Sequence, residues 1–432
     1  MSVVVDDQGI TLLEKKKEEG SVPGSGMAQE HVYGVLARAF EPTTVSHYQT
    51  STQNGFSLPF YSARIQSMIH RRNEFHKEVE FKIEASKDHW SEVEEDVEGE
   101  VSNRHVFEYL KKRWGEFFWD YGDSLVFGEK IAEGGQAEIF EAAVVTRQNV
   151  CEFKYVAKVM RRSGSLVHLK KQWPEGLLRK IDKGCPFSSD TDSCCLIWGA
   201  TLLEDGRFAF LMHRYWGDLR TLIDLRMQHN MNQGPPFRDD SAVLIMYQIA
   251  VAMEELHDQG ILHRDLKASN VLVNVTEDDS YSFDPWHDDG FQCAVADFEC
   301  SVGVVGTGYW RAPEILEVLK DHGNLHDQQI FTQQVDVYSY AMTCYEILTG
   351  CIPFEDRPRT NPEFVLAGER PQLPDHIHPE LSKLISRCWS ADPSQRPTFT
   401  DIVKVITEID RLLSAYRASP KAFICKDCED AR

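Results

Sequence analysis

A chain of 432 residues with 46 basic and 68 acidic side chains carries a formal net charge of −22. This acidity argues against general nucleic-acid binding and favours solubility, and the length allows two or three domains. The first residues are polar and no apolar run approaches the roughly 20 residues that cross a bilayer, so we expect neither a signal peptide nor a membrane span. The 11 cysteines are scattered and odd in number, which indicates reduced thiols in the cytoplasm or nucleus.

Residues 1–121 are expected to form an N-terminal extension that is partly disordered and partly helical. The first thirty or so residues are rich in charged residues, glycine and serine, which is typical of a flexible tail. Between Ala63 and Trp90, apolar residues recur near one helical face: Ile65, Met68, Phe75, Val79 and Ile83. This helix either packs within the protein or pairs with another chain. The acidic run over residues 92–100 is expected to be a solvated linker.

A second amphipathic segment, from Val106 to Trp119, is rich in aromatic side chains. It comes just before the first strand expected for the following domain. Because large rings bury much apolar surface, we expect the segment to dock on that domain. A separate ligand site built from these rings is the alternative.

Residues 131–159 combine a glycine-containing loop with a strand that carries one lysine. The loop runs from Ile131 to Ile139 and has Gly134 and Gly135 at its centre. Glycine allows a backbone to approach phosphate closely. The strand over residues 155–159 is apolar apart from Lys158 and Tyr155. An ordinary hairpin turn is the alternative for the loop, but its place ahead of Lys158 favours a phosphate site.

One glutamate, Glu175, stands in the stretch that follows Lys158, up to Leu178. Pro174 before it is favoured in the first turn of a helix, and Gly176 after it is a poor helix former. Glu175 is therefore either the partner of Lys158 or a surface residue that interacts with the helix dipole.

An aspartate that precedes an asparagine by five residues is the most informative feature of the chain. Asp265 and Asn270 belong to the segment His263–Asn270, which apolar residues flank on both sides. Asp265 can accept the proton of an attacking hydroxyl, and Asn270 can reach a magnesium ion from the other end of this short loop. Lys267 between them can neutralise charge on a transferring phosphoryl group.

Further motifs follow this loop in a fixed order. They are Val295–Glu299 with Asp297 and Phe298, Gly306–Glu314 ending in Ala-Pro-Glu, Asp336–Ala341, and the closing run with Cys388-Trp389, Asp392-Pro393 and Arg396-Pro397.

Taken together, these motifs resemble the eukaryotic protein kinase family. At these motifs, Lys267, Trp310 and Cys388-Trp389 resemble the residues of the tyrosine-kinase-like group of Ser/Thr kinases. The resemblance implies an α+β, two-lobed fold, with a small antiparallel β lobe that contains one helix and a large, mainly helical lobe. We expect the kinase domain at residues 122–415, between the extension 1–121 and a C-terminal tail, 416–432.

The resemblance also implies roles for individual residues. Asp265, Lys267 and Asn270 would be catalytic, and Asn270 and Asp297 would bind Mg²⁺. Lys158, with Glu175 as its partner, would bind ATP together with the loop Ile131, Ala132, Glu133, Gly134, Gly135, Gln136, Ala137, Glu138 and Ile139. In the family, the arginine at Arg396 pairs with the glutamate at Glu314.

Three positions depart from the family pattern. Ala132 and Ala137 stand where the phosphate loop usually has glycine. Glu299 replaces a third glycine, which adds a negative charge beside Asp297 and removes flexibility. These departures, the position of Glu175 and the short segment 297–314 support a pseudokinase or scaffold that binds partners without efficient phosphoryl transfer.

The favoured function is nevertheless an active, Mg²⁺-dependent Ser/Thr protein kinase that uses ATP, because every polar group needed for transfer is present. A kinase of small molecules has less support, since Gly306–Glu314 resembles a peptide-docking element. The segment 297–314 is short, and its hydroxyls are Ser301, Thr307 and Tyr309. We therefore expect control by docking of the N-terminal region, with a regulatory protein as partner, rather than by a phosphate that meets Arg264.

Two remaining segments are assigned no catalytic role. The acidic stretch between Asn274 and Cys293 is expected to be a surface loop between two strands, with a metal site as the alternative. Cys425 and Cys428 have the spacing of a metal or redox pair but lack a second pair nearby.

Overall fold

The structure is a computed structural model, and statements about it concern the residues that it describes: 5–6, 9–10, 103–115, 117–146, 149–150, 155–161, 166, 169, 173, 176–177, 193–275, 285–286, 291–301, 304–321, 328–358 and 362–418. The expected helix over 63–90, the acidic run 92–100, Glu175 and the pair Cys425/Cys428 lie outside these residues. Residues 1–49 form a separate unit, in which β1 (Val5–Asp6) pairs antiparallel with β2 (Gly9–Ile10).

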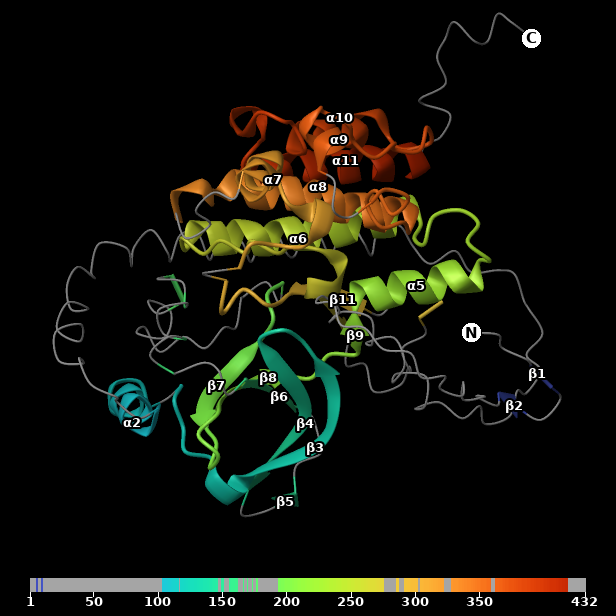
Figure 1. Ribbon diagram of the computed structural model, residues 1–432. Coiled ribbons are helices and arrows are strands. Elements are labelled where there is room, and N and C mark those ends of the chain that lie inside the picture. The colour runs from blue at the N-terminus through green and yellow to red at the C-terminus, as the bar shows by residue number, and fades with distance from the viewer. Residues whose placement is uncertain are drawn as a thin grey trace, which may run out of the picture. The chain divides into compact units, whose positions relative to one another are not determined.

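An antiparallel sheet forms the small lobe (Figure 1). Its strands, in spatial order, are β3 (Leu125–Glu133), β4 (Ala137–Thr146), β6 (Tyr155–Met160), β8 (Phe208–His213) and β7 (Ile197–Leu202), and β5 (Asn149–Val150) pairs with β4. One face buries Ala142, Ala157 and Leu211 in a small apolar core. The register pairs Ile139 with Lys158, so the β3–β4 loop lies beside the lysine strand.

The aromatic segment before the sheet is part of the small-lobe core. Helix α2 (Asn103–Arg113) buries Phe107 and Leu110, and Phe118 after it is completely buried. The Phe118 ring lies 5.9 Å from Trp173 and 6.3 Å from Phe208, measured between ring centroids. The predicted docking of this segment is confirmed by these contacts, and the core extends into residues that the predicted boundary at 121/122 assigned to the extension.

Between Arg161 and Ser193 the structure describes five residues, all buried: Leu166, Leu169, Trp173, Gly176 and Leu177. Gly176 packs so closely on Gln259 that a Cβ atom there would lie 2.0 Å from the Gln259 carbonyl oxygen. This close approach requires glycine and joins the small-lobe segment to the residues that follow α6.

The large lobe is mainly helical, which confirms the predicted two-lobed α+β fold (Figure 1). Its helices are α5 (Leu219–His229), α6 (Asp239–Asp258), α7 (Pro313–Lys320), α8 (Gln333–Thr349), α9 (Glu363–Leu366), α10 (Pro379–Cys388) and α11 (Phe399–Ala418). Short 3₁₀ helices are η4 (Gly122–Ser124), η5 (Ala268–Asn270), η6 (Gly308–Trp310), η7 (Gln328–Ile330) and η8 (Pro393–Gln395). Helix α6 is buried on every side, against α8, α11 and β11, because its middle is apolar all round.

A small sheet carries the residues that border the site. β10 (Val271–Val275) pairs antiparallel with both β9 (Gly217–Asp218) and β11 (Phe291–Val295). The predicted pairing of two strands around the insertion is therefore confirmed. Of the insertion, Pro285 and Trp286 are described: the Pro285 carbonyl accepts a hydrogen bond from Arg226, and Trp286 stacks on His229 at 4.5 Å. Its Asp and His residues lie outside the described residues, so the metal alternative stays untested.

No helix in the described part of the chain has the length and apolar character needed to span a membrane.

Candidate active site

Buried Asp336 on α8 shapes the loop that carries the catalytic candidates. Its two carboxylate oxygens accept hydrogen bonds from the backbone N–H groups of His263 at 2.9 Å and Arg264 at 2.7 Å, and His257 Nε2 lies 2.9 Å away. Arg264 has a φ of 67°, which is unfavourable without glycine, and these bonds stabilise it. Burial alone would raise the pKa of Asp336, but the hydrogen bond with His257 and nearby positive charge lower it. The predicted anchoring of the loop by this helix is confirmed.

Asp265 has one oxygen held and one oxygen free. Its Oδ2 accepts hydrogen bonds from Lys267 Nζ at 2.8 Å and Asn270 Nδ2 at 3.3 Å, and Asn270 Nδ2 also donates to the Asp265 carbonyl at 2.8 Å. Its Oδ1 is buried and has no hydrogen-bond partner in the described part of the chain. The arrangement presents a fixed acceptor that a substrate hydroxyl can satisfy.

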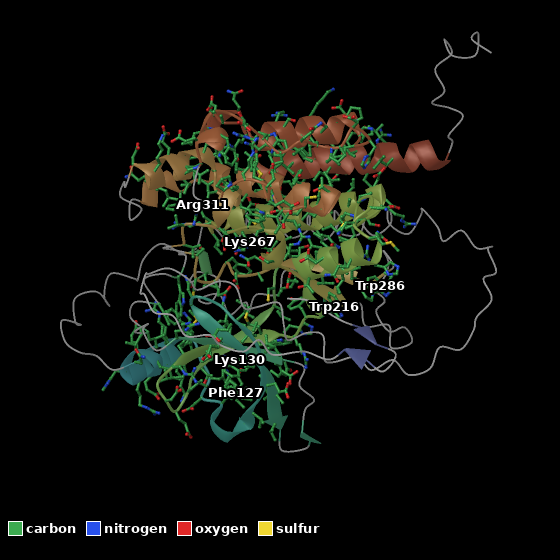
Figure 2. All side chains as sticks on the ribbon, turned by 45° about the vertical axis from the view of Figure 1, so that its right-hand side comes forward. Phe127, Lys130, Trp216, Lys267, Trp286 and Arg311 are labelled. Atoms are coloured by element: carbon green, nitrogen blue, oxygen red, sulfur yellow. The ribbon has the colours of Figure 1, made fainter. Side chains whose placement is uncertain are left out.

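The segment 304–314 contacts the catalytic loop directly. Lys267 Nζ donates to Thr307 Oγ1 at 2.7 Å, so Thr307 connects to Asp265 through the lysine. Ser301 is buried, and the Tyr309 hydroxyl donates to the Pro358 carbonyl. The Arg264 guanidinium lies over the Phe331 ring at 4.4 Å. Figure 2 shows Lys267 and Arg311 on the helical lobe and Lys130 on the sheet of the small lobe.

Glu346 on α8 is a site residue that the sequence did not reveal. Its Oε2 accepts hydrogen bonds from the Ala268 backbone N–H at 3.1 Å and Trp310 Nε1 at 2.8 Å, and its Oε1 lies 3.2 Å from Arg220 Nη1. Burial raises the pKa of this carboxyl above its usual value. Glu346 thus joins the catalytic loop to the segment 306–314 and to α5. The available signal was a lone glutamate in the last turn of a largely apolar helix.

Lys158 on β6 connects the small lobe to the segment that carries Asp297. Its Nζ lies 2.8 Å from Asp297 Oδ1 and also bonds Glu299 Oε1. Burial alone would lower the pKa of Lys158, but Asp297 and Glu299 outweigh burial and raise it well above its usual value. Lys158 in turn holds the pKa of Asp297 below its usual value. The expected pairing of Lys158 with Glu175 stays a prediction, since Glu175 lies outside the described residues.

The predicted phosphate loop is the hairpin between β3 and β4. Ala132 pairs with Ile139 and Glu133 with Glu138, and the Gly134 N–H donates to the Ala137 carbonyl at 2.8 Å. Charged side chains bind this hairpin from outside: Lys130 to Glu133 and Glu138, and Arg161 to Glu133 and the Gly134 carbonyl. Ile131, Gly135 and Gln136 complete the loop, and the residues from Ala132 to Gln136 are exposed.

The expected ion pair that closes the motif series is present. Arg396 Nη1 and Nη2 donate to the two carboxylate oxygens of Glu314 at 2.7 Å and 2.8 Å. This two-pronged geometry gives directional strength, and Arg396 is almost completely buried. It attaches the end of the segment 306–314 to the η8 region.

Asn270 and Asp297 together fit a magnesium ion. Asn270 uses its amide nitrogen within the loop, which leaves its side-chain oxygen for a cation, and Asp297 offers a half-exposed carboxylate that Lys158 keeps ionised. Magnesium commonly binds through one or two protein oxygens plus nucleotide phosphates. Ala296, the residue before Asp297, holds the two candidate ligands near each other. Its N–H donates to the Asn270 carbonyl at 2.9 Å, and its carbonyl lies 2.8 Å from His263 Nε2 in the catalytic loop. The described residues contain no group of three or more His, Cys, Asp or Glu that could hold a metal.

Comparison with known families gives one domain match. Residues 202–405 match the protein kinase domain. The matched range includes the catalytic loop, Asp297 and the segment 306–314. It begins after most of the small-lobe sheet, so Lys158 and the hairpin 131–139 lie outside it.

Individual relatives agree with this match. The chain is 33% identical over 198 residues to the serine/threonine/tyrosine-protein kinase HT1 of Arabidopsis thaliana, which covers 43% of this chain and 45% of the relative. It is 34% identical over 227 residues to the light-sensor protein kinase of Ceratodon purpureus, an alignment that covers 48% of this chain and 17% of the relative. It is 29% identical over 177 residues to the serine/threonine-protein kinase STY17 of Arabidopsis thaliana, an alignment that covers 40% of this chain and 28% of the relative. The chain spans less than half the length of each of these relatives.

Proposed function

We propose that this chain is a protein kinase of the tyrosine-kinase-like group and an active Ser/Thr kinase, which transfers the ATP γ-phosphoryl group to hydroxyls of protein substrates with Mg²⁺. The protein kinase match over residues 202–405 and the kinase relatives support this proposal. The observation that carries the proposal is the state of Asp265. One of its oxygens is held by Lys267 and Asn270, and the other is buried without a partner. A substrate hydroxyl would supply the missing hydrogen bond and transfer its proton to this oxygen.

The neighbouring residues fit the charge changes of such a transfer. Lys267 lies beside Asp265 and would offset negative charge on the moving phosphoryl group. Lys158 would bind phosphate oxygens of the nucleotide beneath the hairpin 131–139. Asn270 and Asp297 would hold Mg²⁺, which supplies charge neutralisation on the β- and γ-phosphates.

The preference for serine and threonine hydroxyls as phosphoryl acceptors is proposed from Lys267 and from the names of the relatives. The names of the relatives include Ser/Thr and Ser/Thr/Tyr kinases. The bond from Lys267 to Thr307 ties the acceptor side of the catalytic loop to the segment 306–314, which Glu314 and Arg396 fix in turn. A peptide serine or threonine presented along this segment would arrive near Asp265.

The test is Mg²⁺-ATP transfer by the purified protein onto itself and onto a generic protein substrate. Asp265→Asn should lower kcat by about 10²- to 10⁴-fold, the usual contribution of a general base. ATP affinity should stay nearly constant, because the base acts mainly in the transition state. Full turnover in Asp265→Asn would contradict the assignment.

A scaffold function is the second candidate, and the alanines at 132 and 137 of the hairpin favour it. Glycines there would let a phosphate approach the backbone more closely. The two functions separate in one experiment. A scaffold would show no transfer to any substrate, even at saturating Mg²⁺-ATP, and its Asp265→Asn variant would behave like the wild type.

A further inference from the structure

Glu299, the residue that replaces a glycine after Asp297-Phe298, is completely buried, with 0% of its surface exposed. Its Oε1 bonds Lys158, and its Oε2 is buried without a hydrogen-bond partner among the described residues. An ionised carboxylate is costly to bury unless a cation and hydrogen bonds compensate. The contact with Lys158 is therefore what makes a glutamate tolerable here, so Glu299 has a defined place in the site.

Within the described part of the chain, the cation that contacts Glu299 is Lys158. Phe298, Cys195 and Cys300 beside it are all buried. Burial raises the pKa of the Cys300 thiol to about 12, with the charge of Glu299 adding to the shift, so this thiol stays neutral. The carboxylate and the ammonium consequently depend on each other.

Asp297 and Glu299 differ in how they contact Lys158. The Asp297 side chain is 53% exposed, whereas that of Glu299 is 0% exposed. An exposed carboxylate can turn toward a metal ion, while a buried one keeps its partner. We infer that Glu299 is the positioning residue for Lys158: it holds the ammonium under the nucleotide phosphates, while Asp297 is left for Mg²⁺. This inference rests on the proposed function and assigns a constructive role to a residue that otherwise counts against activity.

The backbone couples this ion pair to the catalytic loop. Ala296, next to Asp297, is bound through its N–H to the Asn270 carbonyl and through its carbonyl to His263. Glu299 follows three residues later on the same segment. The position of Lys158, a small-lobe residue, is thereby set from the large lobe by the segment that also carries a metal ligand.

The experiment compares Glu299→Gln with the wild type in ATP affinity, measured by calorimetry, and in steady-state kinetics. The variant removes the charge and keeps the shape. Its ATP affinity should fall about tenfold, with a matching rise in KM for ATP and an unchanged KM for the protein substrate. A merely structural role would change both KM values. Glu141→Gln is the matched control, because it removes a different ion pair, Arg214–Glu141 at 2.7 Å, from a position on β4 beyond the hairpin 131–139.

A second comparison tests whether Glu299 acts through Lys158. In a Lys158→Met background, adding Glu299→Gln should change ATP affinity by less than about twofold, because residues that act through one contact are not additive. A further tenfold loss in that background would overturn the inference. Should Glu299→Gln not fold, Glu299→Asp, which keeps the charge, takes its place and should retain part of the affinity.

Restoring the glycine gives opposite results under the two views of this residue. Glu299→Gly should lower ATP affinity as Glu299→Gln does, whereas it would raise activity if Glu299 were a damaging replacement. A larger loss in Glu175→Gln than in Glu299→Gln would also overturn the inference, because it would make Glu175 the main partner of Lys158. If the wild type binds ATP without transferring phosphate, the proposed function fails, and the affinity comparison still decides the role of Glu299.

Discussion

The two halves of the candidate site are held in place by different forces. On the large-lobe side, buried Asp336 and Glu346 accept hydrogen bonds from backbone N–H groups of the catalytic loop. On the small-lobe side, the hairpin 131–139 is held by Lys130–Glu133 at 2.7 Å and Arg161–Glu133 at 2.6 Å, with all three side chains 43–44% exposed.

This difference separates a preorganised part of the site from an adaptable one. Hydrogen bonds to buried carboxylates are strong and costly to break, whereas exposed ion pairs contribute little and are screened by salt. We therefore expect the acceptor side to be in place before substrates arrive, and we expect a bound nucleotide to stabilise the hairpin. Each prediction below tests one side of this contrast.

Asp336→Asn should have the largest effect. An amide in place of the carboxylate cannot accept both backbone N–H groups equally, and we expect a loss of about 4 kcal/mol in unfolding free energy together with almost all activity. Because the folded pKa of Asp336 lies below its usual 3.8, its stabilisation is complete above the unfolded pKa and is lost as pH falls through the folded pKa. Denaturant unfolding at pH 7 and at pH 3 should therefore show a smaller pH dependence in the variant than in the wild type.

The control for Asp336→Asn is Asp321→Asn at the exposed end of α7, which should unfold like the wild type. If Asp336→Asn and the wild type were equally stable, the large-lobe half would not be held more strongly than the hairpin.

Phe118→Ala should have the next largest effect and should act on the small lobe. The completely buried ring contacts Phe107, Trp173 and Phe208, so its loss should cost about 3 kcal/mol. We propose that a regulatory partner acts through this aromatic segment. If so, the Phe118→Ala variant should lose ATP affinity as well as stability. Hydrogen exchange should increase in β7 and β8, and a chain that starts at Asp120 should show the same changes. Equal stability and activity of the shortened chain would contradict this control mechanism.

Glu346→Gln should have an intermediate effect, limited to the acceptor side. The wild-type carboxylate accepts hydrogen bonds from Ala268, Trp310 and Arg220. The glutamine amide nitrogen cannot accept, so at least one of these bonds is lost, which should lower the unfolding free energy by about 1–3 kcal/mol. We expect a lower kcat with unchanged ATP affinity, measured in the same kinetic assay. The exposed pair Lys320–Glu363 provides the control, Glu363→Gln, which should behave as wild type. A change in ATP affinity with an unchanged kcat would contradict the assignment of Glu346 to the acceptor side of the site.

Ala132→Gly with Ala137→Gly should have the smallest effect. Removing two methyl groups from the hairpin lets its backbone approach phosphate more closely, and we expect ATP affinity to rise about threefold or less. The ATP-induced rise in Tm reports the change, since ligand stabilisation follows affinity. A large gain in affinity would show that the hairpin, rather than Lys158, limits nucleotide binding.

The large-lobe part of the fold was predictable because its motifs are local. The Glu314–Arg396 pair and the anchoring of the catalytic loop by the Asp336 helix follow from short residue patterns and are confirmed by the structure. The aromatic content of residues 106–119 likewise predicted that the segment docks. It did not indicate that these rings share one core with Trp173 and Phe208, because core composition depends on which strands lie next to each other.

Contacts between distant residues were not predictable from patterns. Glu346 is 78 positions from Ala268, and Glu299 is 141 positions from Lys158. A single sequence shows Glu299 only as a glycine replacement, and its charge suggested interference with the metal site. The fold adds a second interpretation, because burial next to Lys158 makes the same charge an ion-pair partner.

The buried pair of Lys158 and Glu299 has a pharmacological consequence. Some small molecules could inhibit this domain by displacing Phe298 from its fully buried position and occupying the space behind it. That movement would pull Glu299 away from Lys158 and leave two charges without compensation in an apolar environment. Compounds of this kind should therefore bind weakly, and useful inhibitors of this protein would instead leave Asp297-Phe298-Glu299 in place and contact the nucleotide side.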